Sequence, residues 1–209
     1  MQKVIYLLLL FHIYSCDGFN KTINSEEQNP IENKTPKGIV IQPFGDVPFE
    51  YISYIQRGVY KINRNIHVQK SIPLPKSSYF KNRNRYRADS LIKFLQQRTK
   101  KEQITVGVTI KDISNTKGKI EDYGIMGLGF VNGNSCIVSS FRLSFNNRKE
   151  QLLKLVLHEI GHTEGLRHCD KSNCLMRDCG GKNHWDEENG FCENCKIILI
   201  KRGWYFGKT

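Results

Sequence analysis

The sequence predicts an α/β (α+β) domain, in which helices cover a mixed sheet, followed by a small irregular C-terminal subdomain. Short β-branched segments alternate along the chain with segments whose apolar residues have helical spacing, which is typical of a sheet flanked by helices. After Arg167, Cys, Gly, Asn and Asp dominate, and periodicity returns only in Ile197 to Tyr205. The 209 residues suffice for one domain with a complete core.

Four segments predict extended structure because they are β-branched or alternating and are bounded by Pro, Gly or Asn. They are Ile39 to Ile41, closed by Pro43; Lys61 to Leu74; Gln103 to Ile113; and Tyr123 to Ser140, which holds two stretches around a turn at residues 132–134. The last segment contains Gly127 and Gly129. They lack the spacing and the following helix of a dinucleotide fingerprint, so a bulged or flat strand is the better interpretation.

Three segments have the spacing of amphipathic helices. They are Glu50 to Ile62, Ala88 to Arg98 and Asn147 to Leu166. The second overlaps the most basic part of the chain, Lys81 to Lys101, while its apolar residues recur on one face. We therefore interpret these basic residues as the solvated face of a helix.

The N-terminus predicts an export signal over residues 1–16. Lys3 precedes an almost unbroken apolar run from Val4 to Phe11, which is too short to span a bilayer but suits a signal-peptide core. A buried element of the fold is the alternative, and the polar tract directly after the run argues against it. Cys16 follows Ser15 as in the lipobox of bacterial lipoproteins, so we expect either a lipid anchor on Cys16 or cleavage near Ser15.

The chain is therefore expected to be exported, as a lipoprotein or free protein of the bacterial periplasm, or else to be secreted. Residues 17–37 are polar, cannot bury enough surface to fold alone, and predict a tether. The domain is expected to occupy residues 38–209 as a monomer.

The formal net charge of +12 favours polyanions, anionic membrane surfaces or acidic substrates. Charge alone fixes no partner, so a solvated lysine-rich surface is the plainer interpretation. A nucleic-acid binder is disfavoured by the export signal and by the lack of a stacked aromatic array or a docking motif. We expect no nucleic-acid partner, and membrane contact only through an N-terminal lipid.

Three histidines around the end of the third helix predict a metal site. His158 and His162 lie four residues apart and therefore share one face of a helix. Gly165 can end that helix in a left-handed conformation, after which His168 can return to the same ion. Three neutral nitrogen ligands leave a fourth position for water, which is the arrangement of catalytic zinc. Glu159 can reach a ligand of the metal without binding it, and so predicts a general base.

A second candidate metal site contains four cysteines in two pairs. They are Cys169 with Cys174, and Cys192 with Cys195. Four thiolates satisfy a closed tetrahedral structural zinc. Disulfides are the alternative in an exported protein, although a Cys-x-x-Cys pair suits a metal better. Of the remaining cysteines, Cys136 is interpreted as a core thiol, and Cys179 could replace or join the cluster.

The segment HEIGHTEGLRH, followed by Cys169, Cys174, Met176 and CENC, resembles the extended zinc motif of the metzincin metallopeptidases, and in particular that of the archaemetzincin family. The resemblance extends upstream through IVIQPFGDV and KDISNTKGKIEDYGIMGLGFV, and covers roughly Gly38 to Cys195. It implies a metzincin-like fold with two zinc ions per chain, one catalytic on the histidines and one structural on the cysteines. It also implies that Met176 forms the Met-turn beneath the catalytic zinc.

The same resemblance implies that a strand within Ile125 to Val131 pairs with the substrate backbone. The resulting prediction is a zinc metallopeptidase that acts on peptide or protein substrates. Glu159 would take a proton from water and pass it to the leaving amine. The alternative is a zinc-binding, peptide-binding protein with little or no proteolytic activity.

Overall fold

The structure is a computed structural model and describes residues 35–178 and 180–207. The predicted export segment with Cys16, most of the predicted tether, and Cys179 lie outside these residues.

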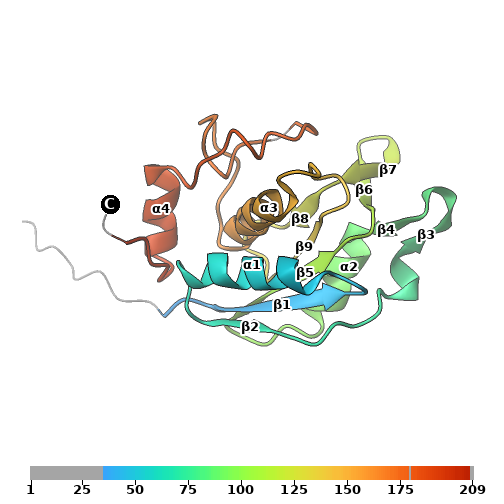
Figure 1. The fold of residues 1–209 in the computed structure, drawn as a ribbon, viewed down its shortest axis with the longest axis horizontal. Coiled ribbons are helices and arrows are strands. Elements are labelled where there is room, and N and C mark those ends of the chain that lie inside the picture. Colours follow the sequence, from blue (N-terminus) through green and yellow to red (C-terminus); the bar gives the residue numbers. More distant parts are fainter. Residues whose placement is uncertain (1–34, 179, 208–209) are drawn as a thin grey trace, which may run out of the picture. The chain divides into compact units, whose positions relative to one another are not determined.

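Five strands form the principal sheet, in the spatial order β2-β1-β5-β9-β8 (Figure 1). Their bounds are β1 (Gly38–Phe44), β2 (Ile66–Val68), β5 (Gln103–Thr109), β8 (Gly127–Gly129) and β9 (Ser135–Ser139). The first four strands of this order are parallel, and β8 pairs antiparallel with β9 at one edge. Every residue of β1 and β9 is buried, as expected for parallel strands that are covered on both faces.

The strand that was expected to end at Pro43 continues to Phe44. Pro43 has no N–H group, but no strand hydrogen bond requires one at this position. Pro43 still accepts a hydrogen bond from Ile72 N on the β2 side of β1. The ladder between β1 and β2 has already ended, at Ile41 opposite Val68. A proline is tolerated in a strand where its nitrogen has no partner strand to face.

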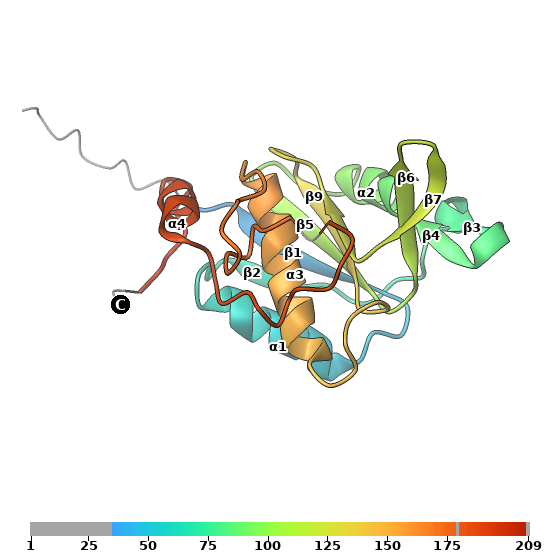
Figure 2. The same ribbon diagram turned by 90° about the horizontal axis from the view of Figure 1, so that it is seen from above.

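Helices cover both faces of the principal sheet. α1 (Phe49–Tyr60) and α3 (Arg148–Thr163) pack against each other and share one buried core with β1, β5 and β9 (Figure 2). α2 (Ala88–Gln96) closes a second apolar cluster on the opposite face, where Leu91, Ile92 and Leu95 meet Ile137. These three helices are the predicted ones, with ends that differ by at most three residues.

A second sheet, in the order β3-β4-β6-β7, adjoins the principal one. Its strands are β3 (Tyr79–Phe80), β4 (Arg85–Arg87), β6 (Ile113–Lys117) and β7 (Ile120–Ile125), accompanied by 3-10 turns at Lys76–Ser78 and Lys81–Arg83. β6 and β7 form an antiparallel hairpin. The segment predicted as one strand to Ile113 divides, because β5 ends at Thr109 and Ile113 already belongs to β6.

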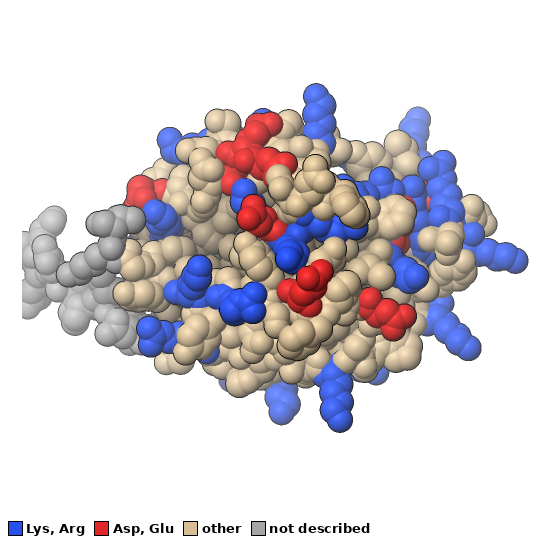
Figure 3. All heavy atoms as spheres, in the orientation of Figure 1, with Lys and Arg blue, Asp and Glu red and all other residues tan. Residues whose placement is uncertain are grey.

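The C-terminal region is irregular apart from α4 (Glu193–Ile200) and contains the four paired cysteines. The predicted fold class is confirmed: the domain is mixed α/β, with a C-terminal cysteine cluster that could hold zinc. Figure 3 shows Lys and Arg side chains over the visible face with Asp and Glu between them, and more of the basic ones toward the end that carries β3, β4, β6 and β7. Within residues 35–178 and 180–207, no helix has the length and apolarity required to cross a bilayer.

Candidate metal centre and active-site cleft

α3 ends at Thr163, three residues before the predicted end at Leu166, and the chain turns at Gly165. Gly165 adopts a φ of +100°, a conformation that side chains rarely allow. Gly165 N donates to His162 O at 2.9 Å, and Leu166 N donates to Gly161 O at 2.9 Å, so the last carbonyls of the helix are satisfied. The chain then reverses, and His168 comes back to the side of His158 and His162.

The two helical histidines present their Nε2 atoms to each other. His158 Nδ1 donates to Leu175 O at 2.5 Å and His162 Nδ1 donates to Leu166 O at 2.9 Å, which leaves both Nε2 atoms as acceptors. These Nε2 atoms lie 3.0 Å apart. Burial, and then the neighbouring His162, lower the pKa of His158 to about 3, and burial also lowers the pKa of His162.

Two neutral acceptors at this separation repel each other unless a cation lies beside them. The donor atoms of His158, His162 and His168 all lie within 4.8 Å of one another. His168 is the exposed member of the set, and its Nδ1 lies 3.7 Å from a carboxylate oxygen of Asp178. Three convergent imidazoles, two of them oriented by backbone carbonyls, fit a zinc ion.

Glu159 is buried in α3 beside these histidines, and burial raises its pKa to about 8. Its carboxylate lies against Gly127 and Gly129 of β8, where added Cβ atoms would collide with it. The three histidines, without Glu159, form the group whose donor atoms converge.

Met176 and Trp185 support the histidines from two sides. Met176 is fully buried, and its Sδ lies against Gly161, between the two helical histidines in sequence. The Trp185 ring meets the His158 ring edge-on at a centroid distance of 5.5 Å. Met176 thus packs against the helix between the two histidines, whereas no local pattern in the sequence indicated Trp185.

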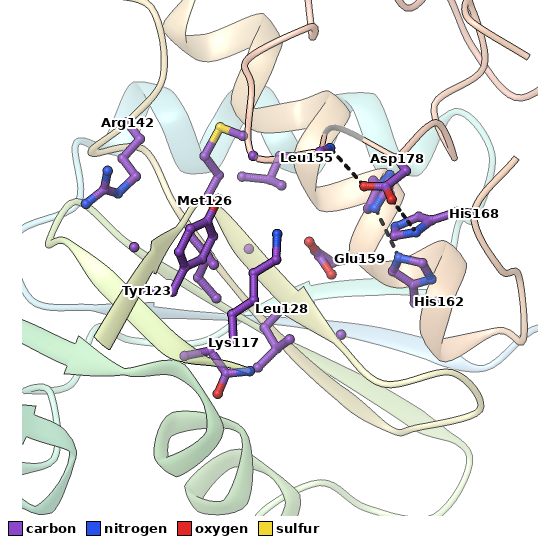
Figure 4. Close-up of a pocket in the computed structure, with 18 of the residues that line it drawn as sticks. Lys117, Tyr123, Met126, Leu128, Arg142, Leu155, Glu159, His162, His168 and Asp178 are labelled. Carbon is purple, nitrogen blue, oxygen red and sulfur yellow. Dashed lines mark hydrogen bonds and ion pairs between the residues drawn. The ribbon is translucent and has the colours of Figure 1, made fainter. Parts of the chain in front are cut away.

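The histidines and Glu159 open into a cleft of about 880 Å³ (Figure 4). One wall is the β6–β7 hairpin with Lys117 and Tyr123, and another contains Asp178 and residues between Gly180 and Trp185. β8 runs along the cleft beside α3. The cleft therefore has room for a chain that passes between an edge strand and the histidines.

The four paired cysteines converge as predicted. Their sulfur atoms all lie within 4.8 Å of one another, with 3.7 Å between Cys169 and Cys192 and 3.8 Å between Cys174 and Cys195. These distances are far longer than a disulfide, and all four are free thiols. Cys174 Sγ also accepts from the Met176 and Cys192 backbone N–H groups, at 3.4 and 3.3 Å. Such a cluster fits a tetrahedral zinc.

At Cys192, hydrogen bonds together have a larger effect on the thiol pKa than burial has. Burial would raise the pKa of Cys192, but bonds from the Cys195 backbone N–H and from neighbouring thiols lower it to about 7. Cys136, in contrast, is fully buried in β9, and burial raises its pKa well above the usual range. Its position agrees with the predicted core thiol.

Comparison with known proteins places this arrangement in a family. The family model described as peptidase family M54 matches residues 42–202. The archaemetzincin of Haloquadratum walsbyi is 31% identical over 175 residues, which cover 76% of this chain and 97% of that protein. The archaemetzincin of Natronomonas pharaonis is 30% identical, over 77% of this chain and 98% of that one.

Solved structures agree. The archaemetzincin of Archaeoglobus fulgidus complexed with malonate aligns with a TM-score of 0.67 at 28% identity, over 77% of this chain and 99% of that chain. That of Methanopyrus kandleri aligns with a TM-score of 0.68 at 23% identity, over 83% and 98%, and so shares the fold. The family match, the relatives and the three converging histidines lead to one conclusion: the chain belongs to peptidase family M54, the archaemetzincins, and is a zinc metallopeptidase.

Proposed function

We propose that the chain hydrolyses peptide bonds with Glu159 as general base, at a zinc ion held by His158, His162 and His168. The observation that carries this proposal is one buried carboxylate placed in the same cleft as three histidines whose donor atoms lie within 4.8 Å. A zinc ion held there would supply Lewis acidity toward a peptide carbonyl and lower the pKa of water toward neutrality.

Glu159 contributes proton transfer. Because burial raises its pKa to about 8, the protonated and ionised forms have similar free energies near neutral pH, and a nearby cation would favour the ionised form. The ionised carboxylate would take the proton of the attacking water. It would then deliver this proton to the leaving amine, which restores the base.

β8 would orient the substrate. Among the described strands only β9 pairs with it, and Gly127, Leu128 and Gly129 line the cleft. An extended peptide could add to this edge through main-chain hydrogen bonds, which give affinity with little demand on sequence.

The test compares Glu159→Gln with Glu164→Gln, the same substitution five residues along. Glu164 is also buried, but its carboxylate accepts from Trp204 Nε1 at 3.3 Å, an acceptor role that a glutamine oxygen can keep. We expect Glu159→Gln to lower the kcat for peptide cleavage by about 10²–10⁴-fold while zinc content stays unchanged. We expect Glu164→Gln to retain activity. Full activity of Glu159→Gln would refute the proposal.

The alternative function is a zinc-binding, peptide-binding protein with little or no proteolytic activity. It would be supported if the purified protein holds zinc and binds a peptide library, but cleaves no peptide above the level of a control inhibited by a zinc chelator.

We also propose that Cys169, Cys174, Cys192 and Cys195 hold a second, structural zinc. Two observations support this structural site: four free thiols converge, and two backbone N–H groups donate hydrogen bonds to Cys174 Sγ. Metal analysis of purified protein should give two zinc ions per chain. One ion per chain that survives substitution of a cysteine would contradict this proposal.

Finally, we propose export, with a lipid on Cys16 or cleavage near Ser15. Its support is the sequence of residues 1–16 alone. Expression in a bacterium followed by fractionation and fatty-acid labelling tests it, since Cys16→Ala would abolish the label on a lipoprotein and leave a cleaved, unlipidated protein unchanged.

A further inference from the structure

The β6–β7 hairpin places one lysine over the cleft. Lys117 closes β6, is exposed, and lines the same cleft as Glu159 and the three histidines. Figure 4 shows its side chain extending into the cleft on the side of Glu159. Lys117 is therefore positioned to meet a substrate that lies along β8.

The face of an aromatic ring holds the Lys117 ammonium in place. Its Nζ lies 4.6 Å from the ring centroid of Tyr123, a residue of β7 that also lines the cleft. The Tyr123 hydroxyl in turn packs against Gly181 on the opposite wall. A cation over a tyrosine face is attracted by the ring quadrupole yet keeps its hydrogen-bond donors, so it can still bind an anion.

The charges that line the cleft leave Lys117 available. The lining carboxylates are Glu159, which is buried, and Asp178, which lies 3.7 Å from His168 and attracts Lys117 only from beyond ion-pair distance. Two arginines also line the cleft: Arg142 is engaged by both oxygens of Asp112 at 2.8 Å, and Arg167 is exposed next to His168 in sequence rather than on the hairpin. Within residues 35–178 and 180–207, no carboxylate forms an ion pair with Lys117.

We propose that Lys117 is a specificity-determining residue that binds a carboxylate of the peptide substrate near the scissile bond. The carboxylate would come from an Asp or Glu side chain or from the C-terminus of a short peptide. This inference rests on the proposed function, because it names the substrate class of the same cleft. The attraction acts at an exposed site, so it shifts selectivity by about three- to tenfold and weakens as salt is added.

Four matched peptides provide the test. They carry Glu or Gln beside the cleaved bond, each with a free or an amidated C-terminus, so that the two sources of a carboxylate are separated. The enzymes are the full chain, Lys117→Ala, Lys117→Glu, and the control Lys119→Ala. Lys119 belongs to the same hairpin and is exposed, but lies outside the cleft lining.

In at least one matched pair, we expect the wild-type chain to cleave the carboxylate-bearing peptide with a kcat/KM three- to tenfold higher than that of its uncharged counterpart. Lys117→Ala should bring the ratio to about one, Lys117→Glu should invert it, and Lys119→Ala should keep it. The proposal is overturned if the wild type shows no preference, or if Lys117→Ala keeps the wild-type ratio.

A binding measurement separates this inference from the peptidase proposal. The same four peptides, labelled with a fluorophore, are titrated into Glu159→Gln with and without Lys117→Ala, and their anisotropy is followed. A Lys117-dependent preference without cleavage by the wild type would refute the peptidase proposal and keep the carboxylate site. Cleavage without any Lys117-dependent preference would do the reverse.

Discussion

The backbone of Gly127 lies directly against the carboxylate of Glu159. A Cβ built on Gly127 would lie 2.9 Å from Glu159 Cδ and closer still to Oε1, and one on Gly129 would lie 2.8 Å from the Glu159 carbonyl oxygen. Two residues of a strand that are separated by one position share a face, so both glycines present an open face of β8 to α3. The strand can therefore approach the candidate base more closely than any other residue pair would permit.

From this contact we expect Gly127→Ala to lower peptide-cleavage activity by about 10–100-fold, because the new methyl group must displace the carboxylate or the strand by a large fraction of an ångström. Zinc content should not change, since the atoms nearest to the new methyl group belong to Glu159 and Leu155 and not to a histidine. Gly190→Ala is the control, because a Cβ at Gly190 meets nothing within 4 Å. Equal kcat/KM values for the two variants would show that the contact does not position Glu159.

The histidine site could be predicted because its geometry is local, whereas the cysteine site was indicated by residue type and by the spacing within each pair. Helical spacing sets His158 and His162, and the left-handed Gly165 returns His168 within a few residues. The glycines of β8 gave a local signal too, since Gly127 and Gly129 alternate as one strand face does. That signal predicts only a bulged or flat strand, because the carboxylate that the glycines accommodate lies about thirty residues away in sequence.

The walls of the cleft could not be predicted from local patterns. Lys117 and Tyr123 face the histidines only because the β6–β7 hairpin forms a separate sheet, whose pairing partner β4 lies more than twenty residues earlier in the chain. Trp185 comes from the irregular C-terminal region, where no periodicity indicates which side chains are buried. Pairing between distant segments decides these positions.

One buried carboxylate links β4 to the loop between β9 and α3. Asp112 accepts from Arg85 Nε at 2.7 Å and from Arg142 Nε and Nη2, both at 2.8 Å. Asp112→Asn should lower the free energy of unfolding by about 1–3 kcal/mol, because two guanidinium groups would lose their shared anion. Denaturant unfolding measures the change. Asp46→Asn, at an exposed position, should alter stability by less than about 0.5 kcal/mol, and an equal effect of both variants would argue against the role of Asp112.

The cysteine cluster should be coupled to the histidines through three consecutive residues. Cys174 belongs to the cluster, Leu175 O holds His158, and Met176 lies against Gly161. We expect Cys174→Ser to reduce the zinc content from two ions to one, to lower stability by about 3 kcal/mol or more, and to lower activity as well.

The matched control for Cys174→Ser is Cys136→Ala, which alters a buried thiol outside the cluster. Cys136→Ala should lower the free energy of unfolding by about 1 kcal/mol, because it leaves a small cavity, and the variant should keep both zinc ions. Metal analysis and thermal melts of both variants check this. A Cys174→Ser protein that retains two zinc ions would contradict the coupling.

Buried Glu188 should make the free energy of unfolding depend on pH, separately from the metal centres. Its side chain is fully buried, and neither of its carboxylate oxygens has a hydrogen-bond partner in the part of the chain that the structure describes. Burial raises its pKa to about 7, against an opposing effect of Lys154. Between pH 4.5 and 7 the folded state therefore binds more protons than the unfolded state, so stability falls as pH rises through this range.

Glu188→Gln removes this dependence. The variant should match the wild type at pH 5 and exceed it by about 1–2 kcal/mol at pH 8, where the wild-type carboxylate is ionised and buried. Glu187→Gln provides a contrast of opposite sign. A bond from Arg177, at 2.6 Å, and one from His184 lower the pKa of Glu187, so its removal should destabilise the protein at pH 8. Denaturant unfolding at pH 5 and pH 8 measures these differences. If the free energy of unfolding of Glu188→Gln changes with pH as much as that of the wild type, Glu188 is not the source of the pH dependence.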